Sequence, residues 1–207
     1  MVRQRVWAAG PQEKQIRRLR VTVAIISDIH DNVWNLRSVL AAAGTADVLV
    51  CCGDLCAPFM VARLAEGFGS RPIHVVFGNN DGDLYRITGV AAGFGNVHLH
   101  GELFSDQLDG RAFVVTHYDT VAATIDRGAA EVICYGHNHQ YALERRDGCW
   151  LINPGAVMGY TPAGNREIAV SFVLYDTRTN EAHGWQVGHG NRCGEAAPLP
   201  GPADSDP

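Results

Sequence analysis

Polar residues that can bind metal ions follow five separate apolar runs of the sequence. In chain order, the clusters are Asp28-Ile29-His30, Gly53-Asp54, Gly78-Asn79-Asn80-Asp81, Thr116-His117 and Gly136-His137-Asn138-His139. They contain carboxylates, amides and imidazoles but no thiols. Such a set of oxygen and nitrogen ligands suits Mn²⁺, Fe or Zn²⁺, and differs from a cysteine-rich structural zinc site.

The clusters offer more ligands than one tetrahedral ion needs. Two divalent metal ions that share a bridging carboxylate would use all of these ligands, and such dinuclear sites, with the ions about 3.5–4 Å apart, occur in phosphatases and nucleases. The pair neutralises phosphate oxygens and lowers the pKa of a bridging water, so that hydroxide can attack phosphorus in line with the leaving oxygen. Asn79 can bind through its carbonyl oxygen without adding negative charge. The expected chemistry is hydrolysis of a phosphoric ester.

The elements that must position the clusters follow from the apolar pattern. Near-continuous apolar runs are typical of strands covered on both faces, and they occur at 21–27, 46–52, 72–77, 112–116 and 130–135. Ligands of open α/β sheets gather beyond the carboxyl ends of strands, so the five clusters should converge on one edge. Helices are predicted at Val33–Ala43, with a cap at Asp31 or Asn32, at Pro58–Glu66, and at Thr120–Arg127 before Gly128. After residue 149, the segments WLINPG, IAVSFVLYD and EAHGWQV predict hairpin-connected strands.

The ordered series resembles the signature of the calcineurin-like metallophosphoesterase superfamily, which runs Asp-x-His, Gly-Asp, Gly-Asn-x-Asp/Glu, His and Gly-His-x-His. The match covers Val21 to about Trp185. The segments SDIHDN, GNND and INPG are most similar to the small YfcE-like phosphodiesterase group, which also includes the retromer scaffold subunit. The resemblance implies an α/β fold, an αββα sandwich of two mixed β-sheets flanked by helices.

The resemblance also implies the ligands of two divalent metal ions. The first ion would be held by Asp28, His30, Asp54 and His139, and the second by Asp54, Asn79, His117 and His137. Asp54 would bridge both ions, and Asp54, Asn79 and His117 would act in catalysis. Asp81 is expected to support catalysis by orienting a histidine ligand. The metal expected is Mn²⁺, with Fe, Zn²⁺ and Ni²⁺ as alternatives.

Three residues depart from the pattern of the superfamily. Asn80 stands where many relatives have a histidine that can protonate the leaving group, and an amide is a poor general acid. We therefore expect a preference for leaving groups that need little protonation. Tyr118 and Asp31 stand where glycine is common, and are expected to narrow the mouth of the pocket.

Composition bounds the class of protein and its partners. The 207 residues are 46% hydrophobic with a net charge of −5, and no 18-residue apolar run occurs, which argues against a disordered or membrane-spanning chain. The acidity argues against nucleic acid as a partner, leaving a small phosphodiester or phosphomonoester substrate. Residues 1–20 predict a basic, flexible arm, 21–187 the metallophosphoesterase domain, and 188–207 a flexible tail rich in Pro and Gly.

Cysteines and the remaining histidines complete the expectations. Cys51 and Cys52 are adjacent in a strand-like run and no paired CxxC motifs occur, so we expect reduced thiols and a cytoplasmic protein. His98 and His100 form a further His-x-His without a carboxylate cluster, and predict a surface strand; His74 belongs to no predicted cluster. A protein-binding scaffold with a vestigial metal site remains the alternative function, and a homo-oligomer is left open.

Overall fold

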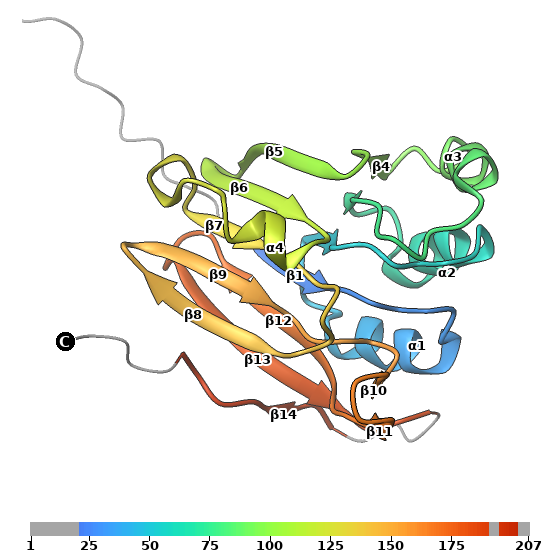
Figure 1. Cartoon of the computed structure of the whole chain (residues 1–207). Coiled ribbons are helices and arrows are strands. Elements are labelled where there is room, and N and C mark those ends of the chain that lie inside the picture. Colours follow the sequence, from blue (N-terminus) through green and yellow to red (C-terminus); the bar gives the residue numbers. More distant parts are fainter. Residues whose placement is uncertain (1–20, 191–194, 203–207) are drawn as a thin grey trace, which may run out of the picture.

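Two large β-sheets pack face to face, and helices cover the outer side of each sheet (Figure 1). The computed structural model describes residues 21–190 and 195–202. The expected αββα sandwich of two mixed sheets is confirmed. No helix in these two ranges is long and apolar enough to cross a membrane.

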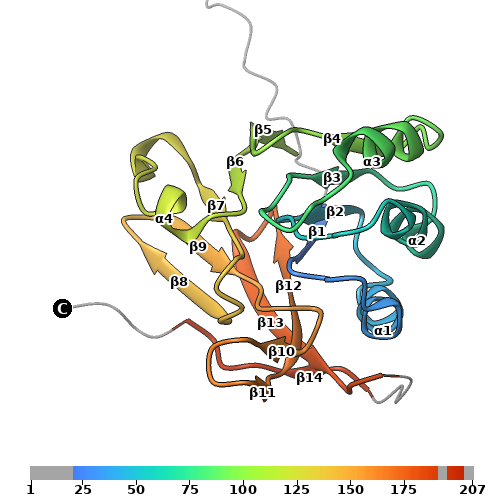
Figure 2. The same cartoon turned by 45° about the vertical axis from the view of Figure 1, so that its right-hand side comes forward.

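The larger sheet combines strands from the first half of the chain with the last three strands. Its seven strands lie in the order β14-β13-β12-β1-β2-β3-β4, where β1 to β4 are parallel and β12 runs antiparallel to β1. Their bounds are β1 Thr22–Ile26, β2 Val48–Cys51, β3 Ile73–Val75, β4 Val97–Leu99, β12 Val170–Asp176, β13 Glu181–Val187 and β14 Ala197–Pro198. The helices α1 Val33–Ala42, α2 Phe59–Phe68 and α3 Leu84–Ala91 follow β1, β2 and β3 and lie together on one side of the molecule (Figure 2).

The smaller sheet has five strands in the order β5-β6-β7-β9-β8. Their bounds are β5 Leu103–Leu108, β6 Arg111–Thr116, β7 Val132–Cys134, β8 Ala142–Arg146 and β9 Cys149–Asn153. The short helix α4 Asp119–Ala122 and the 3₁₀ turn η1 Arg127–Ala129 follow β6, and a small hairpin of β10 Tyr160–Thr161 and β11 Arg166–Glu167 follows β9. Buried residues of the α4 and η1 region pack on the outer face of this sheet.

Burial on both faces explains the continuous apolar runs. In β1, Val23 and Ile25 face the second sheet, whereas Ala24 and Ile26 pack against the helices. Successive side chains of a strand point to opposite faces, so a strand between two cores needs apolar residues at every position. The Asn32 side chain caps α1 by accepting from the Asn35 N–H at 3.1 Å, as the sequence predicts.

The five predicted strands and the first two helices are confirmed, with ends shifted by a few residues. The helix predicted over Thr120–Arg127 is wrong, because α4 ends at Ala122 and η1 begins only at Arg127. Between them, the Asp126 side chain accepts from the Gly128 N–H at 2.9 Å, a local bond that competes with helical pairing. The expected hairpin forms between β12 and β13; β9 also belongs to a hairpin, with the preceding strand β8, and lies in the smaller sheet.

The segment predicted as a flexible tail contributes to the larger sheet. Ala197 and Pro198 form β14, which pairs with Gln186 and Trp185 of β13. Pairing with β13 extends the folded unit beyond residue 187. The predicted arm, 1–20, lies outside the described residues, as do 191–194 and 203–207.

Candidate metal centre

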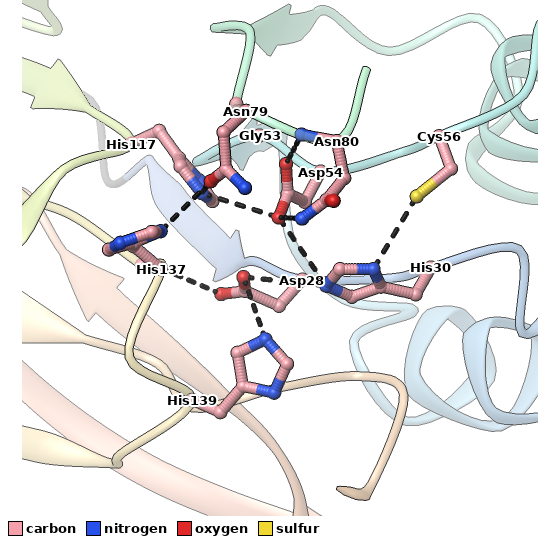
Figure 3. Close-up of polar contacts among 12 residues, drawn as sticks. Asp28, His30, Gly53, Asp54, Cys56, Asn79, Asn80, His117, His137 and His139 are labelled. Atoms are coloured by element: carbon pink, nitrogen blue, oxygen red, sulfur yellow. Dashed lines mark hydrogen bonds and ion pairs between the residues drawn. The ribbon is translucent and has the colours of Figure 1, made fainter. Parts of the chain in front are cut away.

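The structure brings together all seven residues predicted as metal ligands (Figure 3). Four come from loops after strands of the larger sheet and three from loops after strands of the smaller sheet. In chain order, they are Asp28 and His30 after β1, Asp54 after β2, Asn79 after β3, His117 after β6, and His137 and His139 after β7. The clusters therefore converge where the carboxyl ends of the two sheets meet, rather than at the edge of one sheet.

The backbone of this centre is held in a conformation that side chains disfavour. Five of the seven residues have positive φ: Asp28 54°, His30 44°, Asp54 56°, His137 72° and His139 59°. Such left-handed residues cost on the order of 1–3 kcal/mol each, and they persist where the surroundings enforce them, commonly at functional sites. The strain supports a functional assignment for the centre independently of the side chains.

Glycines in the clusters allow neighbouring loops to approach one another closely. A Cβ on Gly136 would lie 1.9 Å from Ser27 Oγ and 2.6 Å from an oxygen of Asp28. A Cβ on Gly78 would lie 2.2 Å from Oδ1 of Asp54. Both glycines are therefore needed so that one cluster can pack on the carboxylate of another.

The first group of ligands gathers around Asp28. Its Oδ1 lies 3.3 Å from Nε2 of His139 and 3.8 Å from Nε2 of His30. Asp28 Oδ1 and His30 Nε2 are both buried and have no hydrogen-bond partner among the described residues. Burial alone would raise the pKa of Asp28, but the facing imidazoles of His139 and His30 hold it well below its usual value.

The second group lies around Asp54. Its Oδ2 is 3.3 Å from Nε2 of His117 and 3.4 Å from Nε2 of His30, so it faces both groups. Oδ1 of Asn79 lies 3.1 Å from Nε2 of His117 and 2.9 Å from Nδ1 of His137. The described residues thus contain two candidate ligand triads, Asp28 with His30 and His139, and Asp28 with Asp54 and His117.

These atoms fit divalent metal ions. The ligand atoms within each triad lie within 4.8 Å of one another, and two of them are buried without a partner. A buried polar atom without a hydrogen bond is costly unless a cation or another group satisfies it. The mixture of carboxylate, amide and imidazole ligands suits Mn²⁺, Fe, Zn²⁺ and Ni²⁺.

Hydrogen bonds at the rear nitrogens fix the orientation of the histidines. Nδ1 of His117 donates to the carbonyl oxygen of Cys52, and Nδ1 of His139 donates to that of Tyr160, each at 2.8 Å. Each ring is thereby turned so that Nε2 faces a carboxylate. Burial lowers the pKa of both rings, but Asp54 beside His117 and Asp28 beside His139 outweigh it and raise both pKa values.

Cys56 supports His30 in the same way, a role that the motif alone does not indicate. Its Sγ lies 3.4 Å from Nδ1 of His30. Burial, together with the charge of Asp31 and other nearby carboxylates, raises the pKa of this thiol to about 12, so it stays protonated. The signal available in the sequence was its position two residues after Asp54.

The expected role of Asp81 is wrong. Its carboxylate accepts hydrogen bonds from the backbone N–H groups of Gly78 at 2.7 Å, Cys56 at 2.9 Å and Asp54 at 3.1 Å. Asp81 therefore anchors the loop of Asp54 rather than orienting a histidine. Asn80 also acts on Asp54, because its backbone N–H and side-chain amide donate to the two carboxylate oxygens at 2.8 and 2.9 Å.

The other two departures, Tyr118 and Asp31, make different contacts. The Tyr118 ring meets the rings of His117 and His137 edge-on, with centroids 5.3 and 5.5 Å apart. Asp31 accepts from the Ala57 N–H at 3.0 Å. Tyr118 therefore stands beside His117 and His137, whereas Asp31 joins the loop after β1 to the loop after β2.

Residues 21–180 match the family model described as a calcineurin-like phosphoesterase superfamily domain. The chain belongs to this superfamily. Its predicted class, phosphoric ester hydrolase, is thereby confirmed. The chain is 27% identical over 143 residues to phosphodiesterase MJ0936 of Methanocaldococcus jannaschii, covering 67% of this chain and 85% of the relative.

Two solved structures have the same fold. An archaeal phosphodiesterase is 25% identical with a TM-score of 0.70, and the match covers 79% of this chain and 98% of the other. Vacuolar protein sorting 29 from Cryptosporidium parvum is 18% identical with a TM-score of 0.62, and the match covers 87% and 96%. The predicted resemblance to the small phosphodiesterase group and to the retromer subunit is confirmed.

Proposed function

We propose that this calcineurin-like phosphoesterase is a dinuclear-metal enzyme that hydrolyses phosphodiesters and, more weakly, phosphomonoesters. The observation that carries the proposal is the pair of ligand triads that share Asp28, with Oδ2 of Asp54 facing His30 and His117. The similarity to a curated phosphodiesterase supports the preference for diesters.

The chain would hold the two ions with ligands from both sheets. Asp28, His30, Asp54 and His139 would hold one ion, and Asp54, Asn79, His117 and His137 the other. When bound, the ions supply Lewis acidity toward the phosphoryl oxygens and an activated water as nucleophile. Because Asn79 and the histidines are neutral, the ligands do not cancel the positive charge of two divalent ions. The site would therefore attract an anionic ester.

The side chains around the ligands favour a good leaving group. Asn80 is a poor proton donor to a leaving oxygen, and its amide already donates to Asp54 at 2.9 Å. Tyr118 stands beside His117 and His137 with a phenol whose pKa is raised by burial and by Glu102 and Asp54. We therefore expect fast turnover only for esters whose leaving oxygen needs little protonation.

The ligand chemistry and the thiols support two finer proposals. We propose Mn²⁺ as the working metal, with Fe, Zn²⁺ and Ni²⁺ as alternatives, because carboxylate and amide ligands accompany the imidazoles. We propose a cytoplasmic location, because the five described cysteines are free: Cys51, Cys52, Cys56, Cys134 and Cys149. A small phosphoester is the proposed partner, in preference to nucleic acid, and self-association stays open.

Hydrolysis of bis-p-nitrophenyl phosphate tests the proposal. Purified protein with Mn²⁺ should release p-nitrophenol, lose this activity on chelation and regain it when Mn²⁺ is restored. Asp54→Ala should lower kcat at least 100-fold, while the control variant Glu181→Ala, at an exposed position of β13, keeps the parent rate. Turnover that persists in Asp54→Ala, or whose rate does not depend on Mn²⁺, would overturn the proposal.

A protein-binding scaffold remains a second candidate, and an exposed apolar surface favours it. Tyr85 is 92% exposed and Leu84 43% at the start of α3, and Phe59 is 47% exposed at the start of α2. A shallow groove beside them is lined by Pro58, Leu84, Tyr85 and Val90. Metal analysis separates the two candidates, because an enzyme purified without added salts should retain transition metal near stoichiometry, whereas a scaffold with a vestigial site should not.

A further inference from the structure

Three histidines gather at the edge of the larger sheet, away from the catalytic ligands. His74 of β3 and His98 of β4 are paired in the parallel register, and His100 follows the end of β4. We call these three residues the His74 cluster. The sequence predicted no partner for His74, because its proximity to the other two depends on which strands pair.

The pleat of the strands turns all three side chains to one face. Ile73 and Val75, the neighbours of His74, belong to the core beneath the helices, so His74 itself faces the second sheet. Val97 packs into the same core and Leu99 packs against it, which directs His98 and His100 to the face of His74. The edge of the second sheet is close, because Phe104 of β5 contacts the cluster.

Two rings of the cluster, those of His74 and His100, are close enough to share one ligand, and the ring of His98 lies beside them. Nδ1 of His74 lies 2.9 Å from Nε2 of His100. The ring centroid of His74 is 5.1 Å from that of His100 and 5.3 Å from that of His98. Phe104 backs the pair, with its centroid 5.1 Å from His74 and 4.6 Å from His100. His98 is the exposed member, so its ring has room to turn toward the other two.

His74 and His100 lie at hydrogen-bond distance, which is close to the spacing of two ligands on one metal ion. Two imidazole nitrogens bound at about 2.0–2.1 Å to one tetrahedral ion lie roughly 3.3 Å apart. The 2.9 Å between His74 and His100 reaches this value with a small rotation of the rings. A set made of imidazoles alone suits Zn²⁺, Ni²⁺ and Cu²⁺, whereas Mn²⁺ prefers oxygen ligands.

His74 and His100 are held in the neutral form that metal binding needs. Burial, with His100 and His98 nearby, lowers the pKa of His74 to about 4 against the opposing attraction of Asp106. Burial and His98 likewise lower the pKa of His100. At neutral pH these rings are neutral, and the neutral imidazole is the form that binds metal ions.

We propose that His74, His98 and His100 form a separate binding site for a divalent transition ion of the Zn²⁺, Ni²⁺ and Cu²⁺ class. The ion would join β3, β4 and the segment after β4 through imidazole nitrogens, with the remaining coordination positions open to water. The site differs from the catalytic centre because its three proposed ligands are all imidazoles, so it should discriminate against Mn²⁺.

Equilibrium dialysis against Zn²⁺, followed by elemental analysis, tests the site in a background that lacks the catalytic carboxylates. The double variant Asp28→Asn/Asp54→Asn of the full chain should retain Zn²⁺, and adding His100→Asn should reduce the retained Zn²⁺ by one ion per chain. Adding His183→Asn, an exposed histidine of β13, should leave it unchanged. Mn²⁺ in place of Zn²⁺ should not be retained by the double variant.

Two results would overturn the proposal. One is a double variant that has the circular dichroism spectrum of the parent but retains no Zn²⁺. The other is a His100→Asn variant that binds Zn²⁺ as tightly as its His183→Asn counterpart. If the double variant does not fold, the parent is used instead, where His100→Asn should reduce the bound Zn²⁺ by one per chain; an unchanged stoichiometry would equally overturn the site.

Discussion

Replacing Asp81 with asparagine tests whether this residue holds the loop of Asp54, the carboxylate proposed to bridge the two ions. Oδ2 of Asp81 accepts from Gly78 and Asp54, and Oδ1 accepts from Cys56. Asparagine keeps the shape but has one acceptor oxygen. With that oxygen in the place of Oδ2, the new amide group faces the N–H of Cys56, and a buried donor loses its partner.

The size of the effect follows from these three bonds. A buried donor left without a partner costs about 1–3 kcal/mol, and the two remaining bonds lose the strengthening that a charged acceptor provides. Burial and the nearby charge of Asp54 raise the pKa of Asp81, so a neutral side chain recovers part of this loss. We expect Asp81→Asn to lower the free energy of unfolding by about 1–3 kcal/mol.

The substitution should also weaken metal binding through Asp54, which lies on this loop. Because Asp81 fixes the N–H of Asp54, we expect Mn²⁺ affinity to fall roughly 10- to 100-fold, as is typical when a residue supporting a ligand is changed. Urea unfolding in EDTA measures the stability and calorimetric titration measures Mn²⁺ affinity, with the exposed Glu167→Gln as a matched control. Stability within about 0.5 kcal/mol of the control, together with parental Mn²⁺ affinity, would refute the reasoning.

Two further predictions concern the same centre. The pKa values of His117 and His139 are raised, so protons compete with metal for these rings above the ordinary value of about 6.5. Affinity for Mn²⁺ should therefore fall as the pH drops through the raised values, and binding should release protons. Titration calorimetry in buffers of different ionisation enthalpy measures both effects, and pH-independent binding without proton release between pH 6 and 8 would contradict the prediction. Gly136→Ala should destabilise the protein by about 1–3 kcal/mol and abolish Mn²⁺ binding, because the new Cβ would lie 1.9 Å from Ser27 Oγ. Urea unfolding measures the change in stability, with Gly201→Ala as the control. A Gly136→Ala variant as stable as the parent would show that the loop moves to accommodate the methyl group.

The sequence predicted which residues gather at the candidate metal centre, because each cluster directly follows a strand. Once the strands are placed, Asp28, Asp54 and Asn79 must lie beyond the same end of neighbouring parallel strands. His117 and His137 likewise lie beyond the ends of neighbouring parallel strands in the smaller sheet. The order of the motifs then identifies the superfamily without any knowledge of distances.

Interactions that join distant loops were not predictable in this way. Asp81 was misassigned because its partners at Asp54 and Cys56 lie 27 and 25 residues away, and no local pattern reports them. The pairing of Ala197 with Gln186 was missed because a two-residue strand has no periodicity to detect. Cys56 and the His74 cluster likewise become visible only when the loops and strands are assembled.

The division of the ligands between two sheets has a consequence for the stability of the molecule. Asp28, His30, Asp54 and Asn79 belong to the larger sheet, while His117, His137 and His139 belong to the smaller one. Ions bound here would act as cross-links between sheets that otherwise adhere through an apolar interface. By mass action, free metal at 100 times its dissociation constant adds about 2.7 kcal/mol to the folded state. The melting temperature should therefore report on metal supply, so that metal depletion would leave the protein both inactive and easier to unfold.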